Sequence, residues 1–235
     1  MTDLPGGPIA SRPLRFFGVL DTSSSMSGSK IGELNFAIRE ALPSMKSTAN
    51  ENPNAQVEIM VLTFGSAVHW LTPAPVPLEQ FTWTDISAGG LTAMGGALEE
   101  VSKKLSPDQM PDRGLPPVIV LVTDGQPTDD FDKGLKALMD QPWAKRSVRL
   151  AIAIGQDADL GPLRRFMEHA ELQPLLANNA DTLASYIRWA STQVLKSASA
   201  PNSTPAGSAV PTSTGSVLPA PPAPDPNAPP PPDVW

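Results

Sequence analysis

The sequence contains no cysteine, and it has only two histidines among its 235 residues. The absence of cysteine excludes disulfide bonds, thiolate metal sites and a cysteine nucleophile. It also suits a reducing compartment, and we therefore expect a cytoplasmic protein. The histidines lie in a predicted hairpin (His69) and at a predicted helix end (His169), where we expect structural and not catalytic roles.

The sequence also lacks an excess of positive charge and long apolar runs. Its formal net charge is −7 and its 17 lysines and arginines are dispersed, which argues against a nucleic-acid-binding surface. No apolar stretch approaches the roughly 20 residues that span a bilayer, so we expect no membrane association. Residues 1–13 lack the basic start and apolar stretch of a signal peptide, and we expect them to be flexible.

Proline is abundant, and its distribution divides the chain. After Lys196, proline, alanine, serine and threonine replace the apolar periodicity of the preceding residues. We therefore predict one folded domain over 14–196 and a disordered or polyproline II tail over 197–235. The tail is either a solubilising segment or a ligand segment, in which residues 233–235 supply an apolar anchor with a carboxylate.

The residues from 14 to 196 alternate between strand and helix patterns. Continuous apolar runs, typical of parallel strands covered on both faces, occur at 14–20, 57–64, 118–122 and 148–154, with a final strand candidate at 172–176. A short run at 67–71 predicts one antiparallel edge strand. Helices are expected at 31–42, 92–105, 129–139, 160–168 and 183–194, with Thr128 or Asp129 and Asp159 as N-caps. The predicted fold class is α/β, a doubly wound, Rossmann-like and mostly parallel sheet with helices on both faces.

Oxygen-bearing side chains follow the first predicted strand. Asp21, Ser23 and Ser25 come directly after residues 14–20. In a nearly extended backbone their alternate spacing points the three side chains in the same direction. Functional groups of an open parallel sheet gather at the carboxyl ends of its strands, so other loops are expected at the same edge.

Two further loops bring oxygen atoms to that edge. Thr92 follows the flexible pair Gly89 and Gly90, and Asp124 follows the strand at 118–122. Each residue alone is explained by capping and turn chemistry. The combination favours a metal site, because oxygen ligands of mixed charge suit Mg²⁺, Mn²⁺ or Ca²⁺ and not zinc or copper.

These residues resemble the metal-ion-dependent adhesion site of von Willebrand factor A (VWA) domains. That site has Asp-x-Ser-x-Ser in one loop, Thr in a second and Asp in a third, and all five positions are matched here in order and spacing. The surrounding words at 21–28, 89–95, 123–129 and 186–191 are similar to the tellurite-resistance, TerY-like branch of bacterial VWA proteins. Ser24 departs from the glycine that many members have, at a position that need not face the ion.

The resemblance implies a VWA fold over about 14–195 and a Mg²⁺ or Mn²⁺ ion held by Ser23, Ser25 and Thr92 or their waters. Part of the role of Asp21 and Asp124 is then to hold these groups in place, and not to contact the ion directly. One coordination position stays open for a carboxylate from an Asp or Glu of a protein partner. The TerY-like branch further implies a tellurite-resistance, stress or defence system that includes a protein kinase and a protein phosphatase.

The leading hypothesis is therefore a non-enzymatic, cation-dependent protein-binding module. One alternative is a scaffold that acts mainly through its tail. A metal-assisted hydrolase is the other alternative, because a bound cation can activate water. Against it, the sequence has no nucleophile elbow, no phosphate-binding loop and no His-Glu-x-x-His motif.

Overall fold

The computed structural model describes residues 11–52, 54–156, 158–168, 172–199, 209–211 and 217–223. The strands are β1 (Arg12–Asp21), β2 (Ala55–Phe64), β3 (Val68–Trp70), β4 (Val76–Pro77), β5 (Val118–Thr123), β6 (Val148–Ile154), β7 (Leu175–Ala177), β8 (Ala209–Pro211) and β9 (Val217–Pro219). The helices are α1 (Ser29–Asn50), α2 (Met94–Lys104), α3 (Phe131–Met139), α4 (Pro142–Lys145), α5 (Leu160–Met167), α6 (Ala180–Trp189) and α7 (Leu195–Ser199). Two 3-10 turns (Ser24–Met26 and Leu78–Gln80) and a π turn (Ala190–Val194) complete the described elements.

The first seven of these strands form one sheet with the order β3-β2-β1-β5-β6-β7, and β4 pairs with the outer side of β2. The pairs β1–β2, β1–β5, β5–β6 and β6–β7 are parallel, whereas β3 and β4 run antiparallel to β2. The predicted mostly parallel sheet with an antiparallel edge is confirmed. The strand β4 was not predicted.

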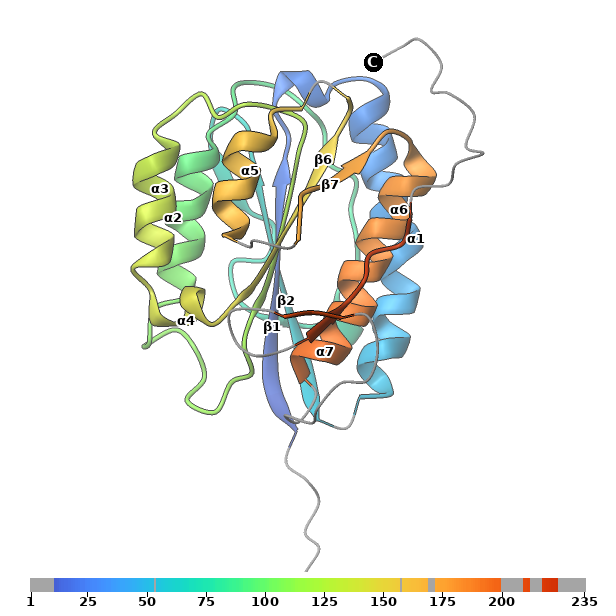
Figure 1. Cartoon of the computed structure of the whole chain (residues 1–235), viewed down its shortest axis with the longest axis vertical. Coiled ribbons are helices and arrows are strands. Elements are labelled where there is room, and N and C mark those ends of the chain that lie inside the picture. Colours follow the sequence, from blue (N-terminus) through green and yellow to red (C-terminus); the bar gives the residue numbers. More distant parts are fainter. Residues whose placement is uncertain are drawn as a thin grey trace, which may run out of the picture.

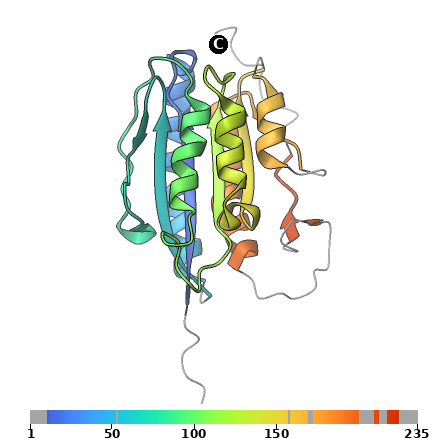
Figure 2. The same cartoon turned by 90° about the vertical axis from the view of Figure 1, so that its left-hand side faces the viewer.

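Helices cover both faces of the sheet, as Figures 1 and 2 show: α2, α3 and α5 lie on one side, and α1, α6 and α7 on the other. Every residue of β5 and β6 is buried between these layers. This arrangement explains why both strands are continuous apolar runs in the sequence, with Arg149 as the charged exception. The predicted α/β class with helices on both faces is thus confirmed.

Several predicted boundaries shift in the structure. The strand β1 begins at Arg12, inside the segment predicted to be flexible, and β7 begins only at Leu175. The helix α3 begins at Phe131 with Asp130 as its N-cap, so the prediction of Thr128 or Asp129 was wrong, whereas Asp159 caps α5 as predicted. Among the described residues no helix has the length and apolar composition that a membrane crossing requires.

The ends of the chain are described only in part. Residues 1–10 and most of the predicted tail, 197–235, lie outside the described residues. Within the tail, β8 and β9 pair antiparallel, with Val210 opposite Leu218, and β9 contacts the π turn and α7. The domain boundary near residue 196 stays a prediction.

Candidate metal centre

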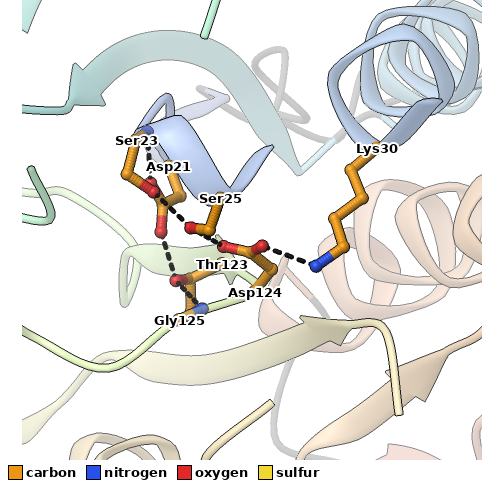
Figure 3. A network of polar contacts seen from close by, with 7 residues as sticks. All are labelled: Asp21, Ser23, Ser25, Lys30, Thr123, Asp124 and Gly125. Carbon is orange, nitrogen blue, oxygen red and sulfur yellow. Dashed lines mark hydrogen bonds and ion pairs between the residues drawn. The ribbon is translucent and has the colours of Figure 1, made fainter. Parts of the chain in front are cut away.

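The carboxyl ends of β1 and β5 bring the first and third predicted loops together. The parallel register pairs Leu20 with Val122, so the next residues, Asp21 and Thr123, lie side by side at the same edge of the sheet. Asp124 follows by one residue. Figure 3 shows the side chains of Asp21, Ser23, Ser25 and Asp124 gathered in one network at this edge.

Asp21 is fully buried and tied to its surroundings through both carboxylate oxygens. Its Oδ1 accepts a hydrogen bond from the backbone N–H of Ser23 at 2.7 Å, and its Oδ2 accepts one from the Thr123 hydroxyl. Burial raises the pKa of Asp21, while the hydrogen bonds from Thr123 and Ser23 act in the opposite direction. Thr123 is therefore a strand-end hydroxyl that holds Asp21 in place.

The two serines link Asp21's loop to Asp124. The hydroxyl oxygens of Ser23 and Ser25 lie 2.9 Å apart, and the Ser25 hydroxyl donates to Oδ1 of Asp124 at 2.7 Å. The other oxygen of Asp124, Oδ2, accepts a hydrogen bond from the Lys30 ammonium group at 2.7 Å. Ser23 and Asp124 are buried, whereas Ser25 is exposed, so the cluster opens to solvent on the Ser25 side.

Thr92 joins the cluster from the second loop. A Cβ atom added to Gly125 would lie 3.5 Å from the Ser25 hydroxyl oxygen and 3.8 Å from that of Thr92, which places both hydroxyls beside Gly125. The backbone N–H of Thr92 donates to the Thr128 hydroxyl, and the N–H of Thr128 donates to the Thr92 carbonyl, both at 3.0 Å. Thr92 is therefore fastened directly to the third loop.

The second loop is also fastened to the first. The backbone N–H and the hydroxyl of Ser24 both donate to the Gly90 carbonyl, at 3.0 and 2.9 Å. Gly90 has a φ of +87°, and a Cβ atom there would lie 2.3 Å from the Ser66 hydroxyl oxygen, so this position requires glycine. The next residue, Leu91, donates its N–H to that Ser66 hydroxyl and exposes 62% of its surface at the edge of the cluster.

The donor set fits a hard divalent cation. Asp21, Ser23, Ser25, Thr92 and Asp124 offer only side-chain oxygen atoms, from two carboxylates and three hydroxyls, and the cluster is reached from solvent at Ser25. Among the described residues no group of three or more His, Cys, Asp or Glu is placed to hold a metal ion. Serine and threonine hydroxyls, or waters on them, must therefore supply part of any coordination shell.

The sequence did not reveal the roles of two residues near the cluster. Lys30 was not among the predicted site residues, and Asp129 was expected to cap the helix that follows it. Asp129 accepts hydrogen bonds from the backbone N–H groups of Gly95 and Gly96, both at 2.8 Å. It thus caps α2, whose own N-cap residue, Ala93, has no side-chain acceptor. Alanine at the start of a predicted helix was the available signal that a cap comes from elsewhere. For Lys30 the signal was a lysine in the first turn of a helix, where acidic residues are favoured.

Comparison with known proteins agrees with this architecture. The family model for the von Willebrand factor type A domain matches residues 17–126, a range that includes all five oxygen-bearing residues. A search of curated proteins found no relative.

Solved structures with the same fold share little sequence with the chain. A von Willebrand factor type A protein from Catenulispora acidiphila is 17% identical, with a TM-score of 0.57, over 77% of this chain and 42% of that one. Proximal thread matrix protein 1 from the mussel byssus, solved with a zinc-occupied MIDAS motif, is 16% identical, with a TM-score of 0.57, over 77% and 47%. BatB from Bacteroides thetaiotaomicron is 14% identical, with a TM-score of 0.55, over 78% of this chain and 100% of its own. The chain spans less than half of the length of the first two structures.

Proposed function

We propose that this chain, which carries a von Willebrand factor type A domain, is a protein-binding module that uses a divalent cation to capture a carboxylate of its partner. The observation that supports the proposal best is the cluster at the carboxyl ends of β1 and β5. It combines two buried carboxylates with three hydroxyls and opens to solvent at one side. Mg²⁺ is the proposed ion, and Mn²⁺ or Ca²⁺ are the alternatives.

In this proposal Asp21, Ser23, Ser25, Thr92 and Asp124 hold the ion. Asp21 already accepts hydrogen bonds at both oxygens, so it acts mainly by orienting the Ser23 segment. The Ser23, Ser25 and Thr92 hydroxyls are neutral donors, which leave the ion electrophilic. When bound, the ion supplies an open coordination position for an Asp or Glu side chain of the partner. The mussel protein, which has the same fold and was solved with a zinc-occupied MIDAS motif, supports the binding of a divalent cation.

Residues at the rim of the cluster are further evidence for the proposal that the partner is a protein. Leu91 precedes Thr92 and is 62% exposed, and its loop is held in place by the hydrogen bond to Ser66. A partner that presents a carboxylate to the ion can therefore bury Leu91 without having to order this loop first. We do not propose catalysis, because Lys30, the ionisable side chain that adjoins the five oxygen-bearing residues, is engaged by the Asp124 carboxylate.

A test on the full-length protein compares Ser25→Ala with Ser27→Ala by calorimetric titration with Mn²⁺. Both serines are exposed in the same loop, but only Ser25 hydrogen-bonds to Asp124. We expect Ser25→Ala to weaken Mn²⁺ binding about tenfold and Ser27→Ala to leave it unchanged. Wild-type protein that binds no divalent cation would refute the metal site.

Carboxylate capture is tested with the Mg²⁺-loaded protein and two short peptides that differ only in aspartate or asparagine. The proposal expects binding of the aspartate peptide alone, and loss of that binding in excess EDTA. Metal-independent binding of either peptide contradicts the bridging role of the ion. Deletion of residues 197–235 separates this proposal from a scaffold that acts through its tail, since only the scaffold would lose its partner.

We further propose a cytoplasmic role in a bacterial tellurite-resistance or stress system that includes a kinase and a phosphatase. The support for this setting is the similarity of the three loop sequences to the TerY-like branch. Purification of the protein with its partners from the native host, with and without EDTA, tests it. Recovery of a kinase or phosphatase only in the absence of EDTA is the expected result.

A further inference from the structure

Lys30 is a buried lysine that contacts the proposed metal site directly. It is the second residue of α1, its side chain is 8% exposed, and its ammonium group lies 2.7 Å from Oδ2 of Asp124, whose side chain is 1% exposed. Figure 3 shows the lysine reaching from α1 to the carboxylate, on the side opposite the Ser25 hydroxyl that binds Oδ1. Asp124 is thus shared between a serine of the cluster and a fixed positive charge.

Lys30 occupies a position that is unfavourable for a positive charge. A positive charge in the first turn of a helix opposes the helix dipole, at about 0.3–1 kcal/mol in exposed positions. Removing an ammonium group from water adds a further cost. Side chains of a helix tilt toward its N-terminus, and from the first turn of α1 Lys30 reaches back over the loop to Asp124. The ion pair with Asp124 offsets these two costs, so the charge is held beside the site by that contact.

The charge balance of the cluster shows what Lys30 changes. Asp21 and Asp124 bring two negative charges, and Lys30 brings one positive charge. A site loaded with a divalent cation is therefore one unit more positive with Lys30 than without it, whatever other groups contact this lysine. In a buried cluster such a difference acts strongly, because solvent screens it little.

We infer that Lys30 sets the ligand preference of the loaded site, weakening its hold on the cation and strengthening its hold on an incoming singly charged carboxylate. This inference rests on the proposed function, since it requires a cation between the cluster and its partner. The ligand class that it names is a monoanionic carboxylate, as in an aspartate or glutamate side chain. Lys30 acts through Asp124 and through its charge, without contacting the ion.

The test uses Lys30→Met in the full chain, because methionine retains an unbranched apolar stem for the buried path. Lys46→Met is the matched control, since Lys46 lies on the same helix and donates to the Glu79 carbonyl, away from the cluster. Two titrations are made: Mn²⁺ with the metal-free protein, and an aspartate-containing tetrapeptide with the Mg²⁺-saturated protein. For Lys30→Met we expect Mn²⁺ to bind about tenfold more tightly and the peptide about tenfold more weakly.

Opposite changes in the two affinities are the diagnostic result, because damage to the structure lowers both. Weakening of both, or no change in either, would overturn the inference while leaving the proposed function intact. Absence of Mn²⁺ binding in the wild-type protein would overturn both. Lys30→Gln, which keeps a hydrogen-bond donor for Asp124 but no charge, covers the case in which Lys30→Met does not fold. The same pair of opposite changes is expected, and unchanged affinities in Lys30→Gln would likewise refute the role of charge.

Discussion

Thr128 and Thr92 exchange two hydrogen bonds of 3.0 Å, one from each backbone N–H group. This pair joins the third loop to the second next to the proposed ligand hydroxyl. Replacing Thr128 with valine removes the side-chain acceptor for the Thr92 N–H, and we expect a loss of about 1 kcal/mol in Mn²⁺ binding. Titration calorimetry measures it. Thr84→Val, at an exposed threonine outside the cluster, serves as the control, and equal effects of both variants would contradict the pairing.

Asp129 stabilises the start of α2 from a different segment of the chain. Because its carboxylate accepts the N–H groups of both Gly95 and Gly96, we expect Asp129→Ala to lower the free energy of unfolding by about 1–2 kcal/mol. Denaturant unfolding measures the change. Asp132→Ala is the comparison, since Asp132 forms only an exposed ion pair with Arg165 and should cost at most about 0.5 kcal/mol. Similar losses in both variants would show that Asp129 is not a cap.

The helices α2 and α3 pack with their backbones in close contact. A Cβ atom at Gly134 would lie 2.2 Å from the carbonyl oxygen of Gly95, and backbone cannot move aside as a side chain can. We therefore expect Gly134→Ala to destabilise the fold by about 2–3 kcal/mol. Gly32 is also the fourth residue of its helix, α1, but has no atom within 4 Å of its Cβ position. Gly32→Ala should stabilise the protein by up to about 1 kcal/mol, and two changes of the same sign would contradict this packing.

Arg149 lies in β6 and binds the C-terminal end of α5. Its guanidinium group donates to the carbonyls of Phe166 and Ala144, at 2.8 and 2.7 Å, and to the Glu168 carboxylate at 3.1 Å. Arg149→Met takes the guanidinium donor from the buried Phe166 carbonyl, whereas the Ala144 carbonyl keeps the Ser147 N–H and hydroxyl as donors. We expect a loss of about 1–3 kcal/mol in thermal or denaturant unfolding. Glu168→Gln should have little effect, because the Glu168 side chain is 66% exposed. A small loss in Arg149→Met would mean that water replaces the arginine.

Glu33 gives the stability a pH dependence. Burial raises the pKa of its carboxyl group, and its Oε2 atom has no hydrogen-bond partner within the described part of the chain. The folded state therefore binds this proton more tightly than the unfolded state, so Glu33 lowers stability as the pH rises between the unfolded and folded pKa values. We expect Glu33→Gln to be more stable than wild type at pH 7 and to lose that advantage near about pH 4. Unfolding curves at both pH values measure it, and a constant difference would exclude this titration.

Much of the fold follows from local patterns in the sequence. The strands from β1 to β6, apart from the two-residue β4, were predicted to within about two residues. For β1, β2, β5 and β6 the reason is an apolar run long enough to be buried on both faces, whereas the edge strand β3 was predicted from its place in a hairpin after β2. The N-cap of α3 was not predicted correctly. Asp129 accepts hydrogen bonds from the start of α2, and Asp130 caps α3. A short polar segment offers several carboxylates to several helix ends, and only the tertiary structure decides which pair forms.

The candidate site shows the same limit. The predicted oxygen-bearing residues lie at one edge of the sheet because parallel register fixes which residues end side by side, and this follows from the order of the loops. Lys30 was not predicted to join them, because a lysine on an amphipathic helix usually extends into solvent. A lysine in the first turn of a helix is a signal that the side chain has a special contact, but its partner is a carboxylate 94 residues away, which the local pattern does not identify.

The proposed site and its supports all lie in one part of the chain, between Asp21 and Asp129. The strands β6 and β7 and the helices α5 and α6 come later and supply none of these side chains, although the strands form one edge of the sheet and the helices cover its opposite faces. The chain is thus divided in its tolerance of evolutionary change. Apart from Arg149 and its partners, the later part can change among residues that preserve burial, whereas the earlier part is constrained by specific atoms. Relatives that bind alike are therefore expected to diverge first after residue 130.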